Sequence, residues 1–150
     1  MFASEEEALA AAEEAYAAYL EAWAVIAREG GIEPERIASH AAGEFYEAEL
    51  EGFATLRENQ WKVTGASVLQ SAQLQYADLD ATEGQEIVAA YLCVDVSGVD
   101  VRDPQGVSVV APTRPDLQAF EVFFDLTESN ALIPSARTPW DAGSVCSTPQ

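Results

Sequence analysis

The chain has 150 residues, of which 26 are acidic and 7 basic, so its formal net charge is −19 at pH 7. This charge excludes nucleic acids and anionic membrane surfaces as partners, because both attract proteins through Lys and Arg. A composition that is 49% hydrophobic lets one domain of this length bury a core without metals. The charge also favours a soluble monomer.

Alanines, acids and apolar residues at helical spacing dominate the chain before Trp61. Ser4 is followed three residues later by Glu7, a capping box that predicts the start of a helix over 5–29. The glycine pair at 30–31 ends that helix, because glycine readily adopts the left-handed conformation of a C-terminal cap.

Two shorter helices follow in the predicted order. Pro34 suits the first turn of a helix over 34–42, and Gly43 breaks it. Amphipathic spacing then predicts a third helix over 44–59, with several glutamates on its wet side.

Beyond Trp61 the hydrophobic period changes to two, which is typical of strands. The predicted strands cover 68–76, 87–96, 99–101, 107–110, 120–126 and 131–137. The strand over 87–96 is apolar on both faces and is therefore expected at the centre of the sheet. The turn signal at 103–106 joins its two flanking strands as a hairpin, and Pro134 places the last strand at an edge.

Helices first and strands second predict an α+β fold, with N-terminal helices packed on an antiparallel sheet. We find no internal repeat and no low-complexity linker. One α+β domain over 1–146 with a flexible tail over 147–150 is therefore expected.

The two cysteines have contrasting settings. Cys93 lies inside the apolar strand, whereas Cys146 lies four residues from the end of a polar tail. This contrast predicts a disulfide that ties the tail to a core strand. Such a bond persists outside a reducing cytosol, so it favours an extracytoplasmic protein.

Catalytic, cofactor and metal motifs are missing from the sequence. The one histidine, His40, and two distant cysteines do not provide the four ligands of a structural zinc site. No nucleophile elbow surrounds a serine, and no glycine-rich phosphate loop follows a strand. We therefore expect no metal, no cofactor and no enzymatic activity.

The space between helices and sheet is the candidate site. Bulky groups predicted to face it are Tyr16, Trp23, Tyr46, Phe53, Leu92, Phe120 and Phe124, and we expect them to fill it as core. Asp95 is the uncertain member, because a register slip of one residue would turn it inward. An open cavity would instead favour a small-molecule carrier or an enzyme with a carboxylate base.

Several segments resemble a known family. They are the start from Phe2 to Tyr16, the stretch from Glu47 to Phe53, the strand from Tyr91 to Val101, and Trp140 followed by Cys146. Together they resemble exported lipoproteins of unknown function from high-GC actinobacteria and their phages. Helices followed by a curved sheet are also similar to the cystatin-like α+β cone of nuclear transport factor two-like proteins, a fold shared by enzymes and inert binding modules.

This resemblance implies an extracytoplasmic, non-enzymatic binding or interaction module of the bacterial cell envelope. It implies a cell-surface lipoprotein whose signal peptide and lipidated cysteine are absent from this chain. The expected partner is a protein or another envelope component, and a phage envelope or virion component is a further interpretation. The sequence does not identify the ligand or the partner.

Overall fold

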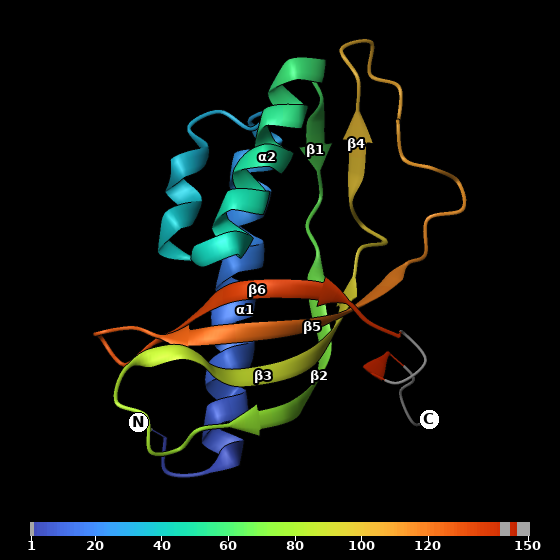
Figure 1. The fold of residues 1–150 in the computed structure, drawn as a ribbon. Helices are drawn as coiled ribbons and strands as arrows, with labels where there is room; N and C mark the ends of the chain where they lie inside the picture. The colour runs from blue at the N-terminus through green and yellow to red at the C-terminus, as the bar shows by residue number, and fades with distance from the viewer. Residues whose placement is uncertain (1, 142–144, 147–150) are drawn as a thin grey trace.

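A computed structural model describes residues 2–141, 145 and 146 of the chain. In chain order the elements are α1 (Glu5–Arg28), the 3-10 helix η1 (Pro34–Ser39), α2 (Gly43–Asn59), β1 (Lys62–Thr64), β2 (Val68–Ala77), β3 (Gly84–Asp95), β4 (Asp100–Arg102), β5 (Leu117–Leu126) and β6 (Leu132–Pro139). The helices pack against antiparallel strands, which confirms the predicted α+β class (Figure 1). Among the described residues, no helix combines the length and apolarity that a membrane span requires.

The main sheet has four strands in the order β2-β3-β5-β6, and all its pairs are antiparallel. The predicted central position of β3 is confirmed, and β3 is largely buried along its length. The last strand, β6, lies at an edge as Pro134 predicted, because proline has no N–H to donate to a further strand.

The predicted hairpin of 99–101 with 107–110 forms in part. The turn forms, and the Val109 N–H donates to the Val101 carbonyl at 2.8 Å, but the pairing is limited to one bridge, Arg102 to Ser108. On its other side β4 pairs with β1 in a separate two-stranded sheet, which the sequence did not predict. Burial favours the β1 side, because Val63 of β1 is 1% exposed, whereas Val107 remains 60% exposed.

The long helix α1 crosses the inner face of the sheet, with α2 and η1 packed beside it (Figure 1). Its predicted cap is confirmed, because the Ser4 hydroxyl accepts the Glu7 N–H at 3.1 Å. The second helix is a 3-10 turn that ends at Ser39, earlier than predicted. There the chain turns so that the Ala42 N–H donates to the Pro134 carbonyl at 2.9 Å, which joins the helical layer to β6.

The short segment that connects β1 to β2 makes a close backbone contact with the segment that connects β3 to β4 (Figure 1). Gly65 has a φ of +78°, and a Cβ there would collide with the carbonyl of Gly98. Only glycine fits such a position without strain. This contact fixes where the β1–β4 sheet branches from the main sheet.

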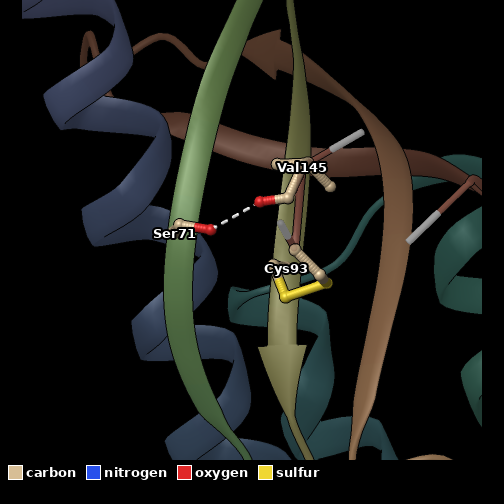
Figure 2. Close-up of a disulfide and its surroundings, with 4 residues drawn as sticks. Ser71, Cys93 and Val145 are labelled. Atoms are coloured by element: carbon tan, nitrogen blue, oxygen red, sulfur yellow. Dashed lines mark hydrogen bonds between the residues drawn. A yellow bond between two sulfur atoms is a disulfide. The ribbon is translucent and has the colours of Figure 1, made fainter. Parts of the chain in front are cut away.

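The predicted disulfide between Cys93 and Cys146 is present, with a Cα–Cα distance of 5.1 Å. It lies on the sheet face opposite α1, where Cys93, Ala119, Val145 and Cys146 form a small buried cluster of their own (Figure 2). The Ser71 hydroxyl donates to the Val145 carbonyl at 2.9 Å (Figure 2). Val145 and Cys146 therefore cover part of the outer face of the sheet. The predicted flexible tail over 147–150 lies outside the described residues.

We predict that replacing both Cys93 and Cys146 with alanine lowers the free energy of unfolding by at most about 4 kcal/mol. The bond closes a loop of 53 residues, which restricts the unfolded chain. Urea unfolding checks this, with Ser71→Ala as a control that removes one tail hydrogen bond and costs about 1 kcal/mol. An alanine pair as stable as the parent protein would contradict a structural role for the disulfide.

Candidate ligand-binding cavity

A cavity of 390 Å³, partly open to solvent, lies between the helices and the inner face of the sheet. Its lining residues are Tyr16, Tyr19, Leu20, Trp23, Ala48, Glu49, Gly52, Leu56, Ser67, Val94, Val96, Val99, Arg114, Gln118, Phe120 and Arg137. The volume falls within the usual range for small-molecule sites, which are mostly apolar with a few convergent polar groups. The prediction that aromatic side chains fill this space is wrong, because the structure leaves it open.

Glu49 is the buried acid of the cavity. It is four residues from both Phe45 and Phe53 on α2, so all three share the buried face of the helix. Glu49 is 6% exposed and accepts a hydrogen bond from the Tyr19 hydroxyl at 2.5 Å. A buried carboxylate requires such partners, because burial removes its hydration.

Arg137 enters the cavity because of a bulge in β6. Before the bulge Phe124 pairs with Pro134, and after it Val122 pairs with Arg137. The extra residue, Ser135, donates its hydroxyl to the Asp125 carboxylate at 2.8 Å. A bulge of one residue exchanges the two faces of a strand, so Arg137 lies on the inner face instead of the outer one.

The Arg137 guanidinium lies between two rings, 4.9 Å from the centre of Phe45 and 4.5 Å from that of Phe120. It donates to the Tyr16 hydroxyl at 3.1 Å and lies 3.8 Å from the nearer Glu49 oxygen. This cluster of Tyr16, Tyr19, Glu49 and Arg137, here called the polar cluster, joins α1 and α2 to β6.

The protonation states of the polar cluster follow from its burial. Burial raises the pKa of Glu49, and the hydrogen bond from Tyr19 and the charge of Arg137 offset only part of that rise. Burial, and then the Glu49 carboxylate, raise the pKa of Tyr19 well above its usual value, so the hydroxyl stays a donor. Burial would lower the pKa of Arg137, but the neighbouring Tyr16, Tyr19 and Glu49 outweigh it and raise that pKa.

Arg114 supplies a second positive charge from the loop before β5. One of its terminal nitrogens donates to the carbonyls of Val96 and Val99, each at 2.9 Å. No ion pair of Arg114 occurs within the part of the chain that the structure describes. Its Nε is buried and has no hydrogen-bond partner there.

Gly52 lies in the middle of α2, at the exposed mouth of the cavity. Its backbone does not require glycine, and a Cβ there would meet nothing within 4 Å. A glycine inside a helix costs about 0.5–1 kcal/mol relative to alanine. The missing side chain therefore weakens the helix and leaves the mouth of the cavity wide.

The candidate lining predicted from the sequence is partly reproduced. Tyr16, Trp23 and Phe120 line the cavity. Phe53, Leu92 and Phe124 are fully buried in the core instead, and Tyr46 packs half-buried against that core. The sequence interpretation missed Glu49, Arg114 and Arg137. The spacing of Glu49 from Phe45 and Phe53 was the available signal, and no comparable signal marked the other two.

Asp95 does not reach the cavity. It shares the outer face of β3 with Tyr91 and Cys93, and its carboxylate accepts the Ser97 N–H at 2.8 Å. Hydrogen bonds from Ser97, the side chain before the backbone, lower the pKa of Asp95. The register therefore excludes Asp95 as the base of a cavity enzyme.

A larger hollow of 720 Å³ lies between the ends of α1 and α2 and the β1–β4 sheet. Two of its basic side chains already have partners, because Arg57 donates to the Gly31 carbonyl and Arg102 forms an ion pair with Asp100. It is more open than the smaller cavity, and none of its ionisable side chains is buried. We therefore regard the cavity with the polar cluster as the candidate site. No group of metal-ligating side chains occurs among the described residues.

Comparison with known proteins gives a fold relationship. No protein-family model matches the chain, and no curated protein sequence matches it. A solved structure, the intermembrane space region of the chloroplast protein ARC6, is similar with a TM-score of 0.61 and 10% sequence identity. The match covers 87% of this chain and 95% of that one. At this identity the likeness shows a shared α+β fold, and the resemblance to actinobacterial lipoproteins stays a hypothesis.

We predict that Glu49→Gln gains stability relative to the parent protein as the pH rises from about 4 to 7. Because burial raises the pKa of Glu49 in the folded state, the folded protein binds the proton more tightly than the unfolded chain. The stability that Glu49 contributes is therefore present at low pH and is lost as the pH rises through its folded pKa. Denaturant unfolding of both proteins at each pH measures the difference between their free energies of unfolding. The contributions of the other acids cancel in this difference, because both proteins share them. A difference that moves in the opposite direction would contradict the raised pKa.

Proposed function

We propose that this protein is a non-enzymatic binding module of the bacterial cell envelope, located outside the cytoplasm, and that it binds a small molecule in the cavity of the polar cluster. The observation that carries the proposal is the cavity itself, an apolar space of 390 Å³ with polar groups converging from three elements. The disulfide supports an oxidising location. The resemblance to exported actinobacterial lipoproteins supplies the envelope setting and a lipid anchor, and both remain part of the proposal.

Binding is favoured over catalysis by the way the acid is held. A general base must reach the proton that it removes. Glu49 is 6% exposed, and its Oε1 is engaged by both Tyr19 and Arg137. The two tyrosines are buried, which keeps their hydroxyls protonated. The cluster thus supplies fixed donors and a fixed charge, the features that orient a ligand.

An enzyme that uses Glu49 as its base is the second candidate. The raised pKa of Glu49 inside a cavity favours it, because perturbed acids concentrate at active sites. Structural ion pairs perturb pKa values in the same way, and Glu49 belongs to such a pair here. Binding is therefore the function that the geometry supports best.

We predict that Gly52→Phe lowers the affinity for the neutral dye N-phenylnaphthylamine about tenfold or more, because the ring would occupy the mouth of the cavity. Dye fluorescence measures the binding. Gly52→Ala is the matched control: it keeps the mouth open and gains about 0.5–1 kcal/mol of helix stability. Undiminished binding to a folded Gly52→Phe protein would move the ligand site elsewhere and overturn the proposal.

A further inference from the structure

We propose that the ligand of this cavity is a monocarboxylate with an apolar body, held through its carboxylate by Arg114 and Arg137. This inference rests on the proposed function and assigns the chemical class of the ligand. It follows from the balance of charge in the cavity, from the charge of Arg114 that no acid of the described residues neutralises, and from the apolar residues of the walls.

The charge of the cavity is opposite to that of the chain. Two of the seven basic residues line it, and Glu49 is the one acid among the 26 that does. Two arginines against one carboxylate leave an excess positive charge in a protein whose total is −19. A ligand with one negative charge would bring this site to neutrality.

The two arginines differ in how far their positive charges are already neutralised. Arg137 already shares its charge with Glu49, at 3.8 Å, and donates to Tyr16. Arg114 meets only backbone carbonyls, which satisfy hydrogen bonds without neutralising the charge. A guanidinium whose charge is not neutralised by an acid binds a carboxylate more strongly than a neutral acceptor.

The apolar residues of the cavity wall determine the chemistry of the ligand beyond its carboxylate. Leu20, Trp23, Val94 and Phe120 form much of the remaining lining. Such walls favour an aryl or alkyl body over a sugar or a nucleotide, which would leave polar groups buried without partners. The acidic outer surface does not prevent entry, because charges more than about 8 Å apart are largely screened at physiological salt.

Three probes of nearly equal shape test the inference: phenylbutyrate, phenylbutanamide and phenylbutylamine, titrated calorimetrically into the whole protein. We expect the carboxylate to bind about tenfold more tightly than the amide, and the amine to bind least. Arg114→Gln should reduce the preference for carboxylate over amide severalfold, and Arg114→Lys should keep part of it. Arg102→Gln is the control, because Arg102 is an exposed arginine outside the cavity and should leave the preference unchanged.

The outcomes separate this inference from the proposed function. Two results together would contradict a carboxylate ligand but keep the cavity as the ligand site. They are equal binding of the three probes, or preference for the amine, and loss of binding in Gly52→Phe. Binding that survives Gly52→Phe, or no binding of any probe, would overturn both. A preference for carboxylate that Arg114→Gln leaves intact in a folded protein would remove Arg114 from the site.

Discussion

The contact between Glu49 and Arg137 is the interaction on which the centre of this fold depends. It joins a helix to the edge strand of the sheet, where two apolar layers would otherwise close on each other. Removing Arg137 would leave the buried Glu49 carboxylate without a compensating charge, which is strongly unfavourable. At 3.8 Å the pair is loose, so Tyr16 and Tyr19 complete its hydrogen bonds. The polar cluster therefore gives the space between the helices and the sheet a polar centre.

This polar centre accounts for the cavity. Ionised groups keep their neighbours at hydrogen-bond distance and cannot be covered by apolar side chains without loss of free energy. The Arg137 guanidinium is instead held between the rings of Phe45 and Phe120, an arrangement that tolerates desolvation of the cation. Gly52 adds the open mouth. The helices and the inner face of the sheet therefore enclose a cavity. Val145 and Cys146 cover part of the outer face of the sheet, where the disulfide holds them.

The sequence predicted those features that repeat along the chain or rely on local chemistry. The capped first helix, the central apolar strand, the edge strand with Pro134 and the cysteine pair follow from spacing and residue type, and the structure confirms them. Glu49 was missed because acids are abundant on this chain, although its spacing from Phe45 and Phe53 marked the buried face. Arg137 could not be predicted, because the bulge at Ser135 reverses the alternation of β6, and only pairing with β5 reveals it.

The fold alone does not identify the function of this protein. The fold shared with the ARC6 region is compatible with many activities, and the site must be judged by its own residues. The pairing of β4 with β1 joins segments far apart in the sequence, whereas local turn chemistry predicts only the contact of β4 with 107–109. The cavity depends on non-local choices of this kind, so it emerges from the assembled structure and not from any motif.

A double-mutant cycle between Glu49 and Arg137 measures directly whether these two residues are coupled in the folded protein. The free energies of unfolding of the parent, Glu49→Gln, Arg137→Met and the combined variant would be measured at neutral pH. We expect a favourable coupling of about 1–3 kcal/mol, because either single change removes the attraction between the two charges and Arg137→Met leaves the buried Glu49 carboxylate uncompensated. Additive effects within about 0.5 kcal/mol would show that the pair does not join the helices to the sheet.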